Sequence, residues 1–224
     1  MSDGGLYYIQ QIVAGIFAIF LGLSVHEYAH ALAAKSQGDI TADHYGRLTL
    51  NPIAHIDPVG TILLPFILLL SSGGRVAYGW AKPVPVNPMA FRHPRRGVFI
   101  VSLAGPASNI ALALAAGVAF RLTYLGGPSG AFQPLQLVLI SIVSINLYLA
   151  FFNLIPIPPL DGSGVVSALL PVELAVEYEK LGRIGMFLIL ALIILGSLAG
   201  FSIIGLIIVP PARALRGLFT GLPY

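Results

Sequence analysis

Two histidines and a glutamate stand close together in the segment His26-Glu27-Tyr28-Ala29-His30. On a helix, His26 and His30 are one turn apart on the same face, so both imidazoles can bind one zinc ion. Glu27 can then act as a general base on water held by that ion. The spacing predicts the metal chemistry of a hydrolase. The alternative, a pair of surface histidines without a metal, is disfavoured by the long apolar run before them.

A carboxylate that could complete this metal site follows much later, in the segment from Asn153 to Gly162. Three prolines lie in this segment: Pro156, Pro158 and Pro159. Proline lacks a backbone N–H, so we expect the chain to leave a helix near Asn153 and run extended to Asp161. Two histidines and one carboxylate form a catalytic zinc set with a fourth position open for water. The alternative is that Asp161 only caps the helix that follows.

The elements that must position these side chains are long apolar segments. Residues 6–25 carry no charge and are long enough to cross a bilayer. Strong apolar segments occupy residues 6–34, 98–124, 135–154 and 184–209. Residues 60–70 are apolar but short, and runs of that length are more often re-entrant or interfacial. Ionisable groups at membrane depth are costly and are usually functional, which supports the metal-site interpretation.

The sequence therefore predicts an all-α polytopic membrane protein. We expect about four full transmembrane helices, a re-entrant or interfacial segment at residues 60–70, and short strand-like loops at residues 39–51 and 76–86. The whole chain, residues 1–224, is expected to form a single transmembrane metalloprotease domain.

Composition supports a membrane protein and excludes other classes. The chain is 57% hydrophobic and 9% charged, whereas soluble domains are about 25% charged. It has no cysteine, which excludes a disulfide framework and a thiolate metal site. The net charge of +3 gives no reason to expect a nucleic-acid partner.

Basic residues predict the orientation in the membrane. Nine of the twelve fall in alternate connections between the apolar segments: Lys35, Arg47, Arg75, Lys82, Arg92, Arg95, Arg96, Lys180 and Arg183. The positive-inside rule assigns such connections to the cytoplasm. The site should thus open toward the cytoplasm. Arg213 and Arg216 would then lie outside, against the rule. A prokaryotic plasma membrane is the expected location.

Three segments together resemble the site-2 protease family of intramembrane zinc metalloproteases: residues 26–30, Gly105-Pro106-Ala107-Ser108-Asn109, and residues 153–162. Residues 51–60 look like those of the compact prokaryotic type. The Gly-Pro-x-x-Asn element is the least specific, since small residues also suit plain helix packing.

The resemblance implies a role for each residue. His26, His30 and Asp161 would bind one Zn²⁺ per chain, and Glu27 would be the catalytic base. Asn153 matches the Asn that opens the family's Asp-Gly motif, and its amide could donate to the developing oxyanion. The family's activity is regulated intramembrane proteolysis, with transmembrane protein substrates in a lipid bilayer.

The favoured function is an intramembrane zinc endopeptidase that hydrolyses peptide bonds within or near transmembrane segments. A divalent-cation transporter or channel could use the same His/Asp site, but permeation does not require Glu27. A catalytically silent scaffold is the third possibility. His55 could be an extra zinc ligand or an interfacial loop histidine, and the oligomeric state stays open.

Overall fold

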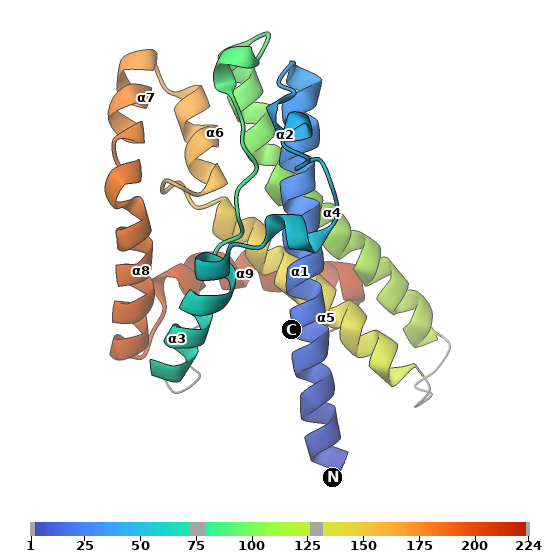
Figure 1. Cartoon of the computed structure of the whole chain (residues 1–224). Coiled ribbons are helices and arrows are strands. Elements are labelled where there is room, and N and C mark those ends of the chain that lie inside the picture. The colour runs from blue at the N-terminus through green and yellow to red at the C-terminus, as the bar shows by residue number, and fades with distance from the viewer. Residues whose placement is uncertain (1–2, 72–78, 126–131, 223–224) are drawn as a thin grey trace.

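The structure, a computed structural model, describes residues 3–71, 79–125 and 132–222, and within these ranges its regular elements are all helices (Figure 1). In chain order they are α1 (Asp3–Gln37), α2 (Thr41–His44), η1 (Pro52–His55), η2 (Pro58–Leu63), α3 (Leu64–Ser71), η3 (Pro88–Ala90), α4 (Pro94–Leu125), α5 (Gln133–Asn153), α6 (Asp161–Leu169), α7 (Val172–Glu179), α8 (Gly182–Ala199) and α9 (Ile203–Thr220). The predicted all-α fold is confirmed.

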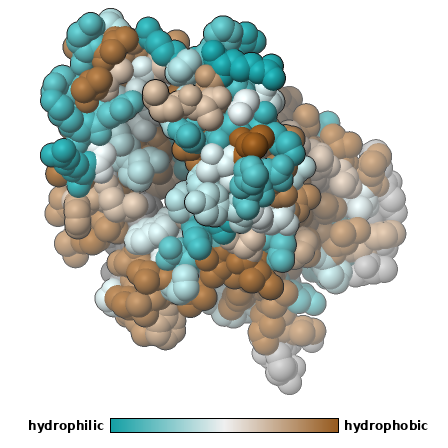
Figure 2. Space-filling view, turned by 45° about the horizontal axis from the view of Figure 1, so that its top comes forward, coloured by the Kyte–Doolittle hydropathy of each residue, from teal (hydrophilic) through white to brown (hydrophobic). Residues whose placement is uncertain are grey.

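Four of these helices are long and apolar enough to cross a membrane: Gly4–Gln37, Pro94–Tyr124, Gln133–Asn153 and Ile203–Thr220. Their outer faces leave large apolar side chains such as Phe17, Leu114 and Leu206 exposed, as lipid contact requires. Figure 2 shows hydrophilic residues gathered over one end of the molecule and hydrophobic residues below it. The protein is therefore an integral membrane protein with one polar end.

The fourth predicted segment, residues 184–209, is not one helix. The chain breaks between α8 and α9, where Gly200 adopts a left-handed conformation (φ 75°) that closes α8. Ser202 then caps α9, because its Oγ accepts a hydrogen bond from the N–H of Gly205 at 2.9 Å. Hydropathy alone does not register these two capping signals. The helix that follows continues through Pro210 and Pro211 to Thr220.

The centre of the bundle consists of α1, α4 and α5, which pack against one another, with α9 lying across α4 and α5. Their contact is made by small and branched residues, including Ala18, Ala113 and Leu147, each fully buried. Small residues let helix backbones approach closely, which drives association inside a bilayer. The two histidines of the predicted metal site, His26 and His30, lie on α1 in this three-helix centre.

Residues 58–71, which we call the re-entrant element, contain residues 60–70, for which the sequence predicts a re-entrant or interfacial segment. The chain descends along η2 and α3, and residue 80 lies again beside residue 60, since the N–H of Trp80 donates to the carbonyl of Gly60 at 3.1 Å. The N–H of Arg92 donates to the carbonyl of Gln37 at 3.0 Å. The segment therefore leaves and returns at the end of the bundle where α1 finishes and α4 begins.

The two predicted strand-like loops have different outcomes. Residues 39–51 are not a strand, because Thr41–His44 form α2 and the hydroxyl of Thr41 bonds the buried Asp39. Residues 79–87 have no regular secondary structure, but their alternate N–H groups bond inward, from Trp80, Lys82 and Val84. That period of two is typical of an extended chain. Residues 76–78 lie outside the described ranges.

The segment after Asn153 turns rather than running extended. The N–H groups of Ile155, Ile157 and Leu160 donate to carbonyls two or three residues earlier, so 154–160 form consecutive tight turns. A Cβ on Gly162 would lie 2.2 Å from the carbonyl oxygen of Leu154. Only glycine permits this contact, which folds the start of α6 back against the end of α5.

Candidate metal centre

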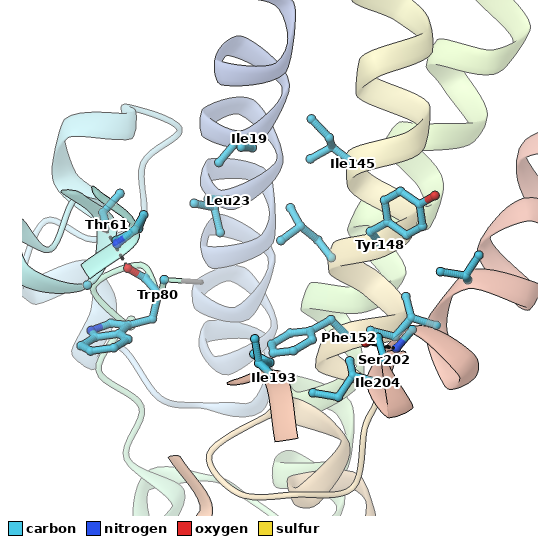
Figure 3. A pocket seen from close by; sticks show the side chains of 17 residues that line it. Ile19, Leu23, Thr61, Trp80, Ile145, Tyr148, Phe152, Ile193, Ser202 and Ile204 are labelled. Carbon is cyan, nitrogen blue, oxygen red and sulfur yellow. Dashed lines mark hydrogen bonds between the residues drawn. The ribbon is translucent and has the colours of Figure 1, made fainter. Parts of the chain in front are cut away.

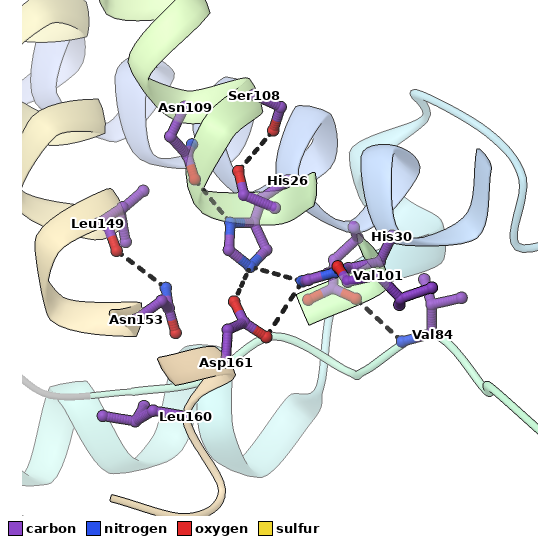
Figure 4. Close-up of polar contacts among 12 residues, drawn as sticks. His26, His30, Val84, Val101, Ser108, Asn109, Leu149, Asn153, Leu160 and Asp161 are labelled. Atoms are coloured by element: carbon purple, nitrogen blue, oxygen red, sulfur yellow. Dashed lines mark hydrogen bonds and ion pairs between the residues drawn. The ribbon is translucent and has the colours of Figure 1, made fainter. Parts of the chain in front are cut away.

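Three predicted ligands meet at one point between α1 and the start of α6. Ligand atoms of His26, His30 and Asp161 all lie within 4.8 Å of one another (Figure 4). The Nε2 of His26 is 3.1 Å from Asp161 Oδ2, and the Nε2 of His30 is 3.3 Å from Asp161 Oδ1. The turn spacing of α1 and the tight turns after α5 bring these side chains together.

Both imidazoles are oriented by acceptors on α4. The Nδ1 of His26 lies 2.6 Å from Asn109 Oδ1, and the Nδ1 of His30 lies 2.7 Å from the carbonyl oxygen of Val101. A carbonyl oxygen can only accept, so each Nδ1 carries the proton and each Nε2 offers a lone pair. Metal-bound histidines usually have such a partner on their second nitrogen.

The amide of Asn109 is itself held in place. Its Nδ2 donates to the carbonyl of Gly22 at 3.1 Å and to Asn146 Oδ1 at 2.7 Å, so its oxygen must face His26. Asn109 and Asn146 are completely buried. A buried polar network is stabilising only when every member is bonded, and this one joins α1, α4 and α5.

The residues fit a metal cation. Two Nε2 lone pairs and a carboxylate converge here, and Asp161 Oδ2 is buried without a hydrogen-bond donor. Electron-pair donors at these distances repel one another unless a cation lies between them. Gly105 leaves the necessary space, because a Cβ there would lie 2.4 Å from His30 Nε2. The cap alternative is not seen, since no side-chain hydrogen bond caps α6.

The Gly-Pro-x-x-Asn element therefore does more than pack helices. Val101, Gly105 and Asn109 are four residues apart on one face of α4, which lies against α1. The first supplies a carbonyl to His30, the second makes room and the third bonds His26. The sequence analysis did not predict that these three residues orient the histidines. The signal was present, because Val101, Gly105 and Asn109 have the same spacing of four residues as His26 and His30.

Glu27 lines the same cavity, whose volume is about 460 Å³ and which also contains the three clustered ligands. The N–H of Val84 donates to Glu27 Oε2 at 2.9 Å, so the extended segment 79–87 holds one carboxylate oxygen. Val84 stands between Pro83 and Pro85, neither of which has an N–H. The second oxygen of Glu27 is left for other partners.

Asn153 also lines the cavity, but its amide is partly engaged. Its Nδ2 donates to the carbonyl of Leu149 in its own helix at 3.0 Å. An amide nitrogen carries two hydrogens, so one remains for another acceptor.

His55 does not join the cluster. It is a buried loop histidine, and its Nε2 lies 2.8 Å from the carbonyl oxygen of Thr49, within its own loop. The metal-binding group found among the described residues contains His26, His30 and Asp161 without it.

Comparison with known proteins finds relatives whose names agree with a metal-dependent protease. The sequence pattern of "Peptidase family M50" matches residues 120–196. A Bacillus subtilis (strain 168) protein named "Putative zinc metalloprotease YwhC" is 39% identical over 204 residues, 87% of this chain and 88% of that protein. A Mycolicibacterium smegmatis protein named "Putative zinc metalloprotease Rip2" is 30% identical over 197 residues, 86% of this chain and 71% of that protein. No solved structure matches the chain.

Proposed function

The chain belongs to peptidase family M50, the site-2 proteases, and is a zinc metalloprotease of the membrane; on that premise, we propose that it hydrolyses peptide bonds within or near the transmembrane segments of other membrane proteins. His26, His30 and Asp161 hold one zinc ion per chain, and Glu27 is the general base. The observation that carries the proposal is the convergence of three metal-binding atoms beside Glu27 in one cavity.

Zinc held by His26, His30 and Asp161 would supply a Lewis acid for activating water and polarising the scissile carbonyl. The free oxygen of Glu27 takes the proton from the attacking water and passes it to the leaving amine. The bond from the Val84 N–H keeps the carboxylate aimed into the cavity throughout. Asn109 and Val101 keep both imidazoles in the metal-binding tautomer.

Asn153 is proposed to assist at the substrate oxygen. The second N–H of its amide is free of Leu149 and lies on a residue that lines the cavity. A donor placed where negative charge develops lowers the barrier, by about 3 kcal/mol in well-studied cases.

The extended segment 79–87 can pair with the substrate backbone over only a short stretch. The inner edge of this segment is already used by the bonds from Trp80, Lys82 and Val84. On the outer edge Pro83 and Pro85 have no N–H, so Ala81 alone among residues 81, 83 and 85 can donate. We therefore expect pairing at Ala81 rather than a long added strand.

The protein is proposed to lie in the plasma membrane of a prokaryotic cell, with its site open toward the cytoplasm. The basic residues between the first two spans, including Lys35, Lys82 and Arg92, support this orientation through the positive-inside rule. Residues 1–224 are proposed to act as a single domain. A cation transporter is not favoured, because the relatives are named metalloproteases and Glu27 has no role in permeation.

The test is Glu27→Gln, which removes the base and keeps every metal ligand. We expect the variant to retain zinc and its melting temperature while turnover of a single-span test protein falls about a thousandfold or more. Zinc content by elemental analysis and cleavage in lipid vesicles check both parts. Cleavage at a large fraction of the parent rate would exclude Glu27 as the base.

A further inference from the structure

A second, apolar cavity adjoins the metal centre (Figure 3). Its volume is about 550 Å³, and it lies among α1, the re-entrant element, α5, α8 and α9. We call it the apolar chamber, and define it by six of the residues that line it: Ile19, Leu23, Ile145, Tyr148, Ile193 and Ile208. Its size is within the range of ligand sites in proteins.

The apolar chamber and the polar cavity of the metal centre adjoin each other. Both are lined by the same five residues: Leu23, Gly79, Trp80, Leu149 and Phe152. The two cavities are therefore close enough for neighbouring parts of one substrate to occupy them. Ile19 and Tyr148 are 41% and 40% exposed, so the chamber also opens on the lipid-facing surface.

The chamber offers little to a polar ligand. The hydroxyl of Thr61 donates to the carbonyl of Trp80 at 2.8 Å, and the Oγ of Ser202 accepts from the N–H of Gly205 at 2.9 Å. Both hydroxyls already make hydrogen bonds, and five of the six residues that define the chamber are aliphatic. Burial of apolar surface is the contribution that such a lining can make to binding.

The chamber lies to one side of the metal centre along the bundle. Ile19 precedes His26 by seven residues on α1, which is about 10 Å along a helix. Ile145 likewise precedes Asn153 on α5, toward the same end of the bundle. An occupant of both cavities therefore runs from the metal centre toward the N-terminal end of α1.

We propose that the apolar chamber binds the membrane-embedded, apolar part of a substrate while its scissile bond lies in the polar cavity. This inference rests on the proposed function. It selects substrates that carry bulky aliphatic or aromatic residues on one side of the cleaved bond. It also places the cleavage near one end of the substrate's membrane span, because His26 and His30 stand in the C-terminal third of α1.

The first test fills the chamber without touching the metal centre. Ile19→Trp adds bulk at the chamber wall, and Ile16→Trp is the matched control, since Ile16 is an exposed isoleucine of α1 outside both cavities. The probes are a single-span protein with a leucine-rich membrane segment and a helix-breaking Asn-Pro near one end, and a soluble peptide of the residues around that break.

Ile19→Trp should raise KM for the single-span probe about tenfold, keep kcat within about twofold, and cleave the peptide like the parent. Ile16→Trp should match the parent on both probes. Equal cleavage of the single-span probe by both variants, with the parent active, would overturn the chamber proposal alone. A zinc-loaded parent that cleaves neither probe would instead overturn the proposed function.

The second test does not depend on turnover or on a large side chain. The chain has no cysteine, so Ile19→Cys and the control Ile16→Cys, each combined with Glu27→Gln, can form disulfides with single cysteines along the probe's membrane segment. We expect crosslinks from residue 19 to apolar positions on one side of the Asn-Pro break, and none from residue 16. If neither cysteine variant forms crosslinks and lipid stays bound in the chamber, the chamber holds a lipid acyl chain and the proposal is overturned.

Discussion

At the scale of single residues, Gly105 is a more specific test of the metal centre than any ligand. A Cβ at this position would lie 2.4 Å from His30 Nε2 and 2.6 Å from His26 Nε2. Gly105→Ala should therefore push the imidazoles out of place and weaken zinc binding about tenfold or more, with every ligand still present. Competition with a chelator measures the affinity.

The matched control is Gly15→Ala, since a Cβ on Gly15 meets nothing within 4 Å on its helix. That variant should bind zinc like the parent. Unchanged zinc affinity in Gly105→Ala would show that the metal does not lie between the two imidazoles.

The choice of the third ligand is a second prediction at this scale. Asp161→Ala should lose zinc, because it removes the carboxylate that faces both Nε2 atoms. His55→Ala should keep zinc, although it can lower stability, since His55 is buried and its Nε2 lies against the carbonyl of Thr49. The opposite pattern of zinc content would identify His55 as the ligand instead.

At the scale of elements, Asp39 connects the end of α1 to the extended segment 79–87. It accepts hydrogen bonds from the N–H of Asn87 at 2.7 Å and from the N–H of Thr41 at 2.9 Å. Burial by itself would raise the pKa of Asp39, but these donors and the Thr41 hydroxyl lower it below the ordinary value.

A lowered pKa predicts the direction of the pH dependence. The unfolded chain binds the proton more readily than the folded one, so the ionised carboxylate stabilises the fold above its ordinary pKa of about 3.9. That stability is lost as the pH falls below this value. Asp39→Asn should lower the melting temperature at pH 7 by roughly 4 °C or more, and the difference from the parent should shrink as the pH falls below the ordinary pKa of Asp.

Melting in detergent across this pH range provides the measurement. Asp43→Asn is the control, because Asp43 pairs with Lys35 at the exposed surface, where an ion pair contributes little. A constant difference between the parent and Asp39→Asn from pH 7 to pH 3 would contradict the role given to this carboxylate.

At the scale of the whole molecule, the topology is open to direct labelling, because the chain has no cysteine. Ser36→Cys and Arg92→Cys lie at the same end of the bundle, where Gln37 and Arg92 are hydrogen bonded, and both positions are exposed. We expect both to react with a membrane-impermeant thiol reagent from the cytoplasm. Gly4→Cys, at the opposite end of α1, should react from outside.

Labelling of Ser36→Cys and Arg92→Cys from opposite sides would mean that residues 58–71 cross the membrane fully. Labelling of both from outside would reverse the proposed orientation while leaving the fold unchanged.

The sequence by itself determined the chemistry and most of the elements. A turn of helix fixes the distance between His26 and His30, and a run of about 20 apolar residues fixes a membrane helix, because both are local properties of the chain. Three of the four predicted spans therefore correspond to α1, α4 and α5. The break at Gly200 was equally local, but its capping signals were hidden within a continuous apolar run.

Only the tertiary structure decided which distant groups meet. The tautomers of His26 and His30 depend on acceptors 83 and 71 residues away, and the oxygen held by the Val84 N–H depends on how a re-entrant segment returns. Neither is encoded by local periodicity. They follow from the close approach of α1, α4 and α5, which buried small residues permit and which a buried amide network then fixes in a single arrangement.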